Sequence, residues 1–420
     1  MNKFLKNLTS NPLMAGSAVI FAGSIVSNIG SYLYHLFAGR ILGPVGYGEL
    51  ASLISLLYIF GVPTSVLSTV LIKYFSQCKA SNAPGEAKDL YIRMVQLLGK
   101  ISVGLLVIFL IATPYIASFL NLTTSRSLVW IFIGFVLSIF ATINGSVMQG
   151  FQLFLWVSVY GALGMLIKLS ISTPLAFFGV EWTIIGSLIA SIIVFGLSFI
   201  PIRFVFRVAR KPFRLTKKEL LLFSIPTFFT LLGLTSLYSF DIVLVRHFFT
   251  PQQSGLYSAI ATLGKVIFYA SSAVTMVLFP VLSERNAKGE PTGKILRIAL
   301  GLVSLISVGV TCVYFLFPDV VIHLLFGSSY DGASQYLGLF ACFISLYSLG
   351  NVFVLTCLAV NKLSIWIITL IAAIMQAILI SLFHQTIMEV IIVNISVISL
   401  FVLFAFLYYI YGHASMKKTV

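Results

Sequence analysis

The stretch RFVFRVARKPFRLTKK occupies residues 203–218, halfway along a chain of 420 residues, and carries seven Lys and Arg. Long apolar segments lie on both sides of it, and about 20 apolar residues suffice for a helix that crosses a bilayer. We predict an all-α membrane protein with about twelve spans, because a lipid-exposed backbone must satisfy its own hydrogen bonds. The stretch then separates an N-terminal six-helix bundle (1–202) from a C-terminal six-helix bundle (220–420), with a basic cytoplasmic linker at 203–219.

Composition and charge support this interpretation. The chain is 59% hydrophobic and 9% charged, with a mean hydropathy of +1.07, which excludes a water-soluble globule. The connections between the spans can be numbered along the chain. Twenty of the 26 Lys and Arg then fall in the N-terminus, the even-numbered connections and the C-terminus. Basic segments stay cytoplasmic, so both termini should lie inside. The net charge of +15 comes mostly from this bias and does not indicate nucleic-acid binding. The expected spans are 13–37, 47–72, 94–120, 128–150, 154–178, 182–202, 221–246, 256–280, 295–317, 336–360, 363–383 and 389–411.

The two halves carry a weak internal repeat. A constant shift of 207 residues aligns three pairs, namely Pro44 with Pro251, Gly48 with Gly255, and Asn144 with Asn351. Six helices per half give both halves the same orientation, so a duplication predicts a pseudo-two-fold axis along the membrane normal.

Lys168 lies about 14 residues into the fifth span, roughly 21 Å from its inner end at 1.5 Å per residue. A lysine at that depth costs about 2.5–3.5 kcal/mol. Gly161, Gly164 and Ser172 share its face of the helix, so this small and polar face should point into the protein. We predict a cationic residue of a cavity. A side chain that snorkels to the outer interface is the alternative.

Lys265 and Asp241 form the second charged group within the spans. Lys265 lies roughly 14 Å below the outer surface, and the depths of the two residues differ by about 6 Å. One interpretation is a structural ion pair between spans 7 and 8, since buried charges usually pair. In the other interpretation, Asp241 binds a proton or a sodium ion, or it pairs with Lys265 and this pairing changes when an anion binds.

A polar stripe follows span 1, where Ser17, Ser24, Asn28, Ser31 and His35 recur at helical spacing. It predicts either polar contacts between helices or one wall of a hydrated pathway that would place Asn28 and His35 near the substrate.

Arg40 and Arg246 lie at the outer ends of spans 1 and 7. They could anchor these helices at the headgroups, or clamp an anion, because guanidinium binds phosphate in a bidentate way. Pro63 follows Gly61 within span 2 and predicts a kink, which is either a hinge or a static bend.

No other motif carries recognisable chemistry. The four cysteines follow no ligand spacing and should be free thiols. The sequence has no metal-ligand spacing, phosphate-binding glycine loop or nucleophile–base pair, so we expect no catalytic residue, no metal and no cofactor.

Four short motifs lie at predicted helix ends along the whole chain. They are RILGPVGYG at 40–48, QGFQ at 149–152, DIVLVR at 241–246 followed by GLY at 255–257, and FGSSY at 326–330. In this order they resemble those of O-antigen and capsule repeat-unit flippases, which belong to the multidrug/oligosaccharidyl-lipid/polysaccharide exporter superfamily.

This resemblance implies two six-helix bundles in a V around a central cavity, in a bacterial plasma membrane. It implies transport of an undecaprenyl-pyrophosphate-linked oligosaccharide from the inner to the outer leaflet, with Lys168 and Lys265 receiving the pyrophosphate. The implied partners are the lipid-linked sugar, membrane lipids and other membrane proteins of polysaccharide assembly.

Two other functions stay open. A cation-coupled multidrug exporter of the same superfamily should carry acids deep in the first bundle, where this sequence has none. A membrane-embedded polysaccharide polymerase or ligase would need a reactive outer loop, and the loop from Pro318 shows no clear reactive pairing.

Overall fold

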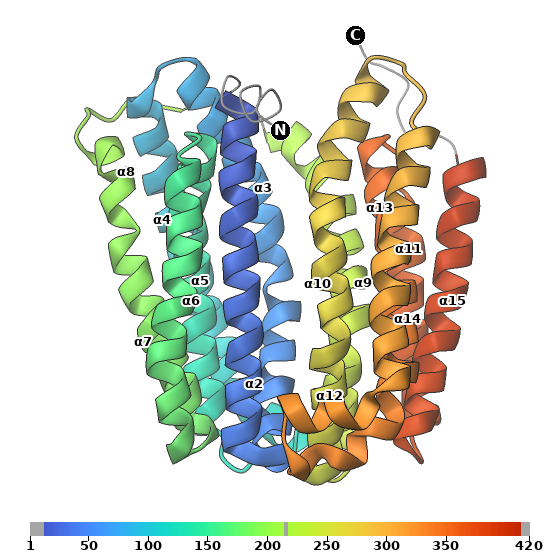
Figure 1. The fold of residues 1–420 in the computed structure, drawn as a ribbon. Coiled ribbons are helices and arrows are strands. Elements are labelled where there is room, and N and C mark those ends of the chain that lie inside the picture. Colours follow the sequence, from blue (N-terminus) through green and yellow to red (C-terminus); the bar gives the residue numbers. More distant parts are fainter. Residues whose placement is uncertain (1–11, 214–216, 413–420) are drawn as a thin grey trace, which may run out of the picture. The chain divides into compact units, whose positions relative to one another are not determined.

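The computed structural model describes residues 12–213 and 217–412, and nearly all of them lie in helices (Figure 1). This part of the chain contains no strand, so the predicted all-α class is confirmed. Both termini and linker residues 214–216 lie outside it, and the cytoplasmic position of the termini stays a prediction. The helices are α2 (Pro12–Phe60), α3 (Val62–Ala80), α4 (Pro84–Phe119), α5 (Arg126–Gly150), α6 (Phe154–Leu175), η1 (Ala176–Phe178), α7 (Val180–Leu197), α8 (Phe199–Phe206), α9 (Lys217–Phe248), α10 (Pro251–Ala287), α11 (Gly293–Leu316), α12 (Pro318–Leu325), η2 (Ser328–Ala333), α13 (Ser334–Ala359), α14 (Ile365–Leu382) and α15 (Ile387–Tyr411).

Eleven helices of the described residues are long and apolar enough to cross a membrane. The sequence predicts about twelve spans, and the difference arises in α2 and α3. Helix α2 is counted once, although it consists of two helical segments that meet at Gly43 (φ 65°, ψ 177°). Glycine is favoured there because a side chain would be strained at this positive φ. The predicted span 47–72 is not continuous either, because α2 ends at Phe60 and α3 begins at Val62.

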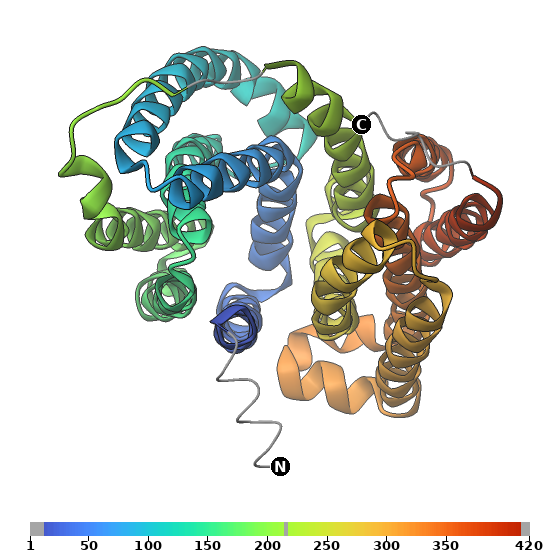
Figure 2. The same ribbon diagram turned by 90° about the horizontal axis from the view of Figure 1, so that it is seen from above.

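The chain divides into two compact units. The first contains residues 1–42 and 63–221, and the second contains 43–62 and 222–420. The second segment of α2 therefore groups with the C-terminal helices. Figure 2 shows most of the long helices of each unit roughly end-on.

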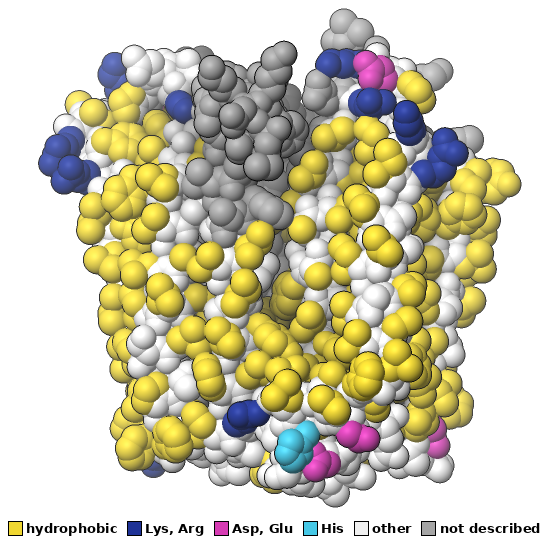
Figure 3. All heavy atoms as spheres, in the orientation of Figure 1, with side chains coloured by type: hydrophobic (Ala, Val, Ile, Leu, Met, Phe, Trp, Pro, Cys, Tyr) yellow, Lys and Arg dark blue, Asp and Glu magenta, His cyan; other side chains and the backbone are white. Residues whose placement is uncertain are grey.

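The outer surface of the helices suits lipid. Large apolar side chains such as Ile111, Leu305 and Leu382 are exposed by about two-thirds. Figure 3 shows apolar side chains over the middle of the visible face, with Lys and Arg at the ends of the helices. This is a multi-pass membrane protein.

In the first unit, α7 lies against α5 and α6. Gly186 allows the close approach of α6 and α7, since a Cβ there would lie 2.6 Å from the Cα of Ser172. Ser172 is buried at this contact, where its hydroxyl donates to the carbonyl of Thr183 at 2.6 Å. Near the other end of α7, Asn144 donates to Ser198 at 2.7 Å.

The first part of the basic linker is fixed to the first unit. Asp89 of α4 is buried, and its carboxylate accepts from Arg210 Nε at 2.6 Å and from the backbone N–H of Phe213 at 2.9 Å. Arg93 Nε adds an ion pair to Asp89 at 2.8 Å. Lys88 donates to the carbonyl of Val208 at 2.9 Å. The linker is therefore an ordered extension of the first unit as far as Phe213.

In the second unit, α13 lies among α10, α11 and α15. The second segment of α2 contacts α10 through two glycines, because a Cβ on Gly48 would lie 2.8 Å from the backbone nitrogen of Gly255. Gly48 and Gly255, which the internal repeat aligns with each other, are thus in contact.

Candidate functional site

Lys168 of α6 holds its ammonium over an aromatic ring. Its Nζ lies 3.9 Å from the ring centroid of Tyr34, a buried residue of the first α2 segment. The Tyr34 hydroxyl lies 3.3 Å from Ser187 Oγ, which lies 3.0 Å from Ser172 Oγ. Among the residues that the structure describes, no carboxylate lies within 4.0 Å of Lys168. A cation–π contact of this kind stabilises the ammonium without neutralising its charge.

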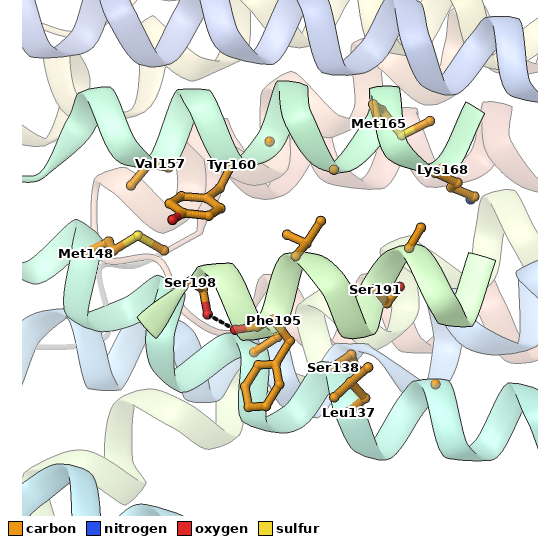
Figure 4. Close-up of a pocket in the computed structure, with 17 residues that line it drawn as sticks. Leu137, Ser138, Met148, Val157, Tyr160, Met165, Lys168, Ser191, Phe195 and Ser198 are labelled. Atoms are coloured by element: carbon orange, nitrogen blue, oxygen red, sulfur yellow. Dashed lines mark hydrogen bonds between the residues drawn. The ribbon is translucent and has the colours of Figure 1, made fainter. Parts of the chain in front are cut away.

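Lys168 also lines a cavity of about 420 Å³ inside the first unit. Figure 4 shows it between α5, α6 and α7, with Lys168 toward one end and Met148 and Val157 toward the other. Gly161 and Gly164 line the same cavity, so the predicted small face of this helix is confirmed for these two residues. Ser172 does not line it and contacts α7 instead.

Lys265 of α10 lies in an aromatic environment in the second unit. Its Nζ is 5.4 Å from the ring centroid of Tyr58, in the second α2 segment, and 5.2 Å from that of Tyr238 in α9. The Tyr238 ring contacts Phe268 and Tyr347 at centroid distances of 5.6 and 5.4 Å. Lys168 in the first unit and Lys265 in the second thus each lie over a tyrosine of α2.

Asp241 of α9 is fully buried in a network of polar side chains. Tyr257 of α10 donates to its Oδ2 at 2.6 Å, and Asn394 of α15 donates to Tyr257 at 2.9 Å. Gln376 of α14 donates to Asn394 Oδ1 at 2.8 Å. Within the described ranges, no Lys or Arg nitrogen lies within 4.0 Å of the Asp241 carboxylate, so Asp241 and Lys265 form no direct ion pair in this structure.

Arg246 follows Asp241 on α9 and has a different environment. Its guanidinium is 1% exposed and lies 3.6 Å from the carboxylate of Glu49, which is equally buried. This burial favours a structural ion pair over contact with headgroups or with an anion. Arg40, near the C-terminal end of the first α2 segment, is exposed.

The other predicted site residues lie on or after α2. Asn28 is exposed and His35 is partly exposed, with its ring 5.4 Å from that of Tyr34 in an edge-on contact. The side chain of Ser17 lies outside the described part of the chain. Pro63 is in the first turn of α3, where proline is well tolerated, and it lies two residues after Gly61, which separates α2 from α3. The roles of these residues stay predictions.

Several partners of the charged side chains, in both units, could not be predicted from the sequence. Tyr34, Tyr58 and Tyr257 are tyrosines among many, and nothing in their spacing marks them as neighbours of charged side chains. Gln376 and Asn394 could have been singled out from the sequence. Burying an amide within an otherwise apolar span costs free energy, so such residues usually have a function or a partner.

The fold matches that of several solved membrane proteins. The chain is similar to an inward-facing MATE family multidrug transporter of the MOP superfamily, with a TM-score of 0.70, 15% identity and coverage of 93% of this chain and 98% of the other. It is similar to the lipid II flippase MurJ, with a TM-score of 0.71, 15% identity and coverage of 94% and 87%. A MOP transporter from Pyrococcus furiosus Vc1 gives a TM-score of 0.61, 18% identity and coverage of 95% and 96%. No curated protein sequence matches the chain.

A family model identifies the family of the chain. The model of the polysaccharide biosynthesis proteins matches residues 37–335, more than half of the chain. The chain belongs to this family.

Proposed function

We propose that this protein flips undecaprenyl-pyrophosphate-linked oligosaccharide repeat units from the cytoplasmic to the outer leaflet of a bacterial plasma membrane, with both termini in the cytoplasm. The family supports a role in polysaccharide biosynthesis, and the structures that the chain resembles are transporters and a flippase. The protein would act by alternating access of its two helical units and would not be an enzyme.

The observation that carries this proposal is the pair of lysines within the spans. Lys168 and Lys265 are each held over tyrosine rings at distances of 3.9 to 5.4 Å. In the described structure neither has a carboxylate within 4.0 Å, so the protein keeps two positive charges available at membrane depth. A pyrophosphate that crosses the apolar core needs such charges, because burying an unpaired anion is expensive.

The same tyrosines suit the sugar part of the substrate. Their rings offer an apolar face and a polar tip. Tyr58 and Tyr238 beside Lys265 belong to a larger group of aromatic residues that includes Phe268 and Tyr347. We propose that the lysines receive the pyrophosphate while the aromatic residues contact sugars.

A cation-coupled multidrug exporter is the second candidate. The buried Asp241 network is compatible with it, since a carboxylate without an adjacent cation suits a bound proton or metal cation. Such a site is equally compatible with a flippase that uses an ion gradient. Identifying the transported molecule would therefore distinguish the two functions.

Reconstituted flipping with lysine variants tests the proposed role of these charges. In proteoliposomes, Lys168→Ala and Lys265→Ala should each slow flipping of a fluorescent lipid-linked oligosaccharide about tenfold or more. A hydrogen bond to a charged group is worth ~1.5–3 kcal/mol, and 1.4 kcal/mol corresponds to tenfold.

Lys100→Ala in α4 is the matched control, because Lys100 is an exposed lysine of the first unit and should not affect the rate. Wild-type rates in both Lys168→Ala and Lys265→Ala, at equal reconstitution, would remove the basis of the proposed anion path.

A further inference from the structure

We propose that the cavity between α5, α6 and α7 binds the isoprenoid chain of the lipid-linked substrate next to its phosphate, while Lys168 binds the phosphate itself. This inference rests on the proposed function and assigns a part of the substrate to a place within the first unit. All residues that line the cavity belong to that unit.

The lining of the cavity is mainly apolar. Leu137, Met148, Val157, Met165 and Phe195 contribute side chains from α5, α6 and α7. Methionine adapts to irregular apolar partners because its side chain is flexible and polarisable. The volume of about 420 Å³ lies within the range of ~300–1,000 Å³ that is typical of sites for small ligands.

The hydroxyl groups of the lining are already engaged with the backbone. Each of the four donates to a carbonyl: Ser138 to Phe135 (2.7 Å), Ser191 to Ser187 (2.9 Å), Ser198 to Phe195 (2.6 Å) and Tyr160 to Leu197 (2.6 Å). Lys168 is the one charged residue of the lining. The lining therefore offers no free hydroxyl donor and only one charged group, which suits an apolar ligand with one anionic end better than a sugar, whose oxygens would need several donors.

Missing side chains create the space. Gly134, Gly145, Gly161 and Gly164 all line the cavity. A Cβ on Gly145 would meet no atom within 4 Å, so a larger side chain at this position would enter the empty volume without a backbone collision.

The shape agrees with a chain that extends from a phosphate. Lys168 and Val157 lie toward opposite ends of the cavity in Figure 4. They are 11 residues apart on α6, which corresponds to about 16 Å along the helix axis. This is about half of the ~30 Å apolar thickness of a bilayer, so the cavity can hold the first part of a long polyprenyl chain while the rest stays in lipid.

Photolabelling in nanodiscs tests this site. The probe is a polyprenyl pyrophosphate with a photoreactive diazirine in the isoprenoid units nearest the phosphate, and labelled peptides are mapped by mass spectrometry. We expect labels on the cavity segments of α5, α6 and α7. Gly145→Leu should reduce labelling about tenfold, which corresponds to 1.4 kcal/mol of binding free energy. Gly104→Leu in α4 is the matched control, because a Cβ there also meets no atom within 4 Å and Gly104 does not line the cavity.

Two results would overturn the inference. One is equal labelling of wild type and Gly145→Leu. The other is equally strong labelling by a phospholipid with a diazirine in its acyl chain, which would make the cavity a site for bulk lipid. Flipping of the complete lipid-linked oligosaccharide by wild type is measured in parallel. Labels in the cavity without flipping would contradict the proposed function and leave the polyprenyl site supported. Flipping without cavity labels would contradict the site alone.

Discussion

At the scale of single residues, the central feature is how the membrane tolerates Lys168 and Lys265. A lysine at the bilayer centre costs about 2.5–3.5 kcal/mol, and a desolvated cation–π contact returns about 2 kcal/mol or more. The two terms nearly cancel, so a tyrosine ring can hold a lysine at depth without a carboxylate. Arg246 shows the other solution, since it is buried against Glu49. The first solution leaves the positive charge available for an anion, whereas the second does not.

Asp241 leads to a prediction about energy coupling. Asp241→Asn keeps a side-chain oxygen that can accept from Tyr257, so the protein should insert and remain folded. The substitution removes the negative charge that could bind a proton or a sodium ion. We expect transport that no longer responds to an imposed proton or sodium gradient in proteoliposomes.

Asp319→Asn is the control for this experiment, since Asp319 is an exposed acid of α12 and should leave any gradient response unchanged. If Asp241→Asn responds to the gradients as wild type does, Asp241 has no coupling role and the network is structural.

At the scale of elements, the contact of α2 with α10 depends on glycine. In Gly255→Ala, the new Cβ would collide with the carbonyl of Pro44, which is backbone and cannot turn away. We expect a loss of about 1–3 kcal/mol of stability, as in other overpacked contacts, visible as a lower midpoint of thermal unfolding in detergent.

Gly104→Ala should instead be neutral or stabilising by up to about 1 kcal/mol, because alanine favours the helix and space is open there. Equal midpoints for Gly255→Ala and Gly104→Ala would show that the second α2 segment does not contact α10 as closely as described.

The same elements show what the sequence could predict. Apolar length placed the spans correctly from α4 onward, because a helix that crosses lipid needs a long apolar run whatever its neighbours are. Helical spacing also placed Gly161 and Gly164 on the face of Lys168. Spacing within one helix cannot identify the partner helix, so Tyr34 and Tyr58 were missed. The break between Phe60 and Val62 was only indicated by Gly61 and Pro63, and the grouping of residues 43–62 with the second unit is a tertiary property.

At the scale of the whole molecule, the chain passes between its two units three times. Two of these passages coincide with breaks in helical structure, at Gly43 in α2 and between Phe60 and Val62. The third follows the linker, which Asp89 fixes to the first unit as far as Phe213. Alternating access requires two units that move as bodies and connections that bend between them. The two helix breaks are the places where α2 and α3 could bend with the least loss of hydrogen bonding.

Measuring which class of molecule the protein transports tests the proposed function most directly. Wild-type protein in proteoliposomes would be given a fluorescent undecaprenyl-pyrophosphate oligosaccharide and, in separate vesicles, a cationic dye with imposed proton and sodium gradients. We predict that the lipid-linked sugar is flipped faster than in protein-free vesicles and that the dye is not exported. Export of the dye without flipping of the lipid-linked sugar would contradict the account and make this protein a multidrug exporter.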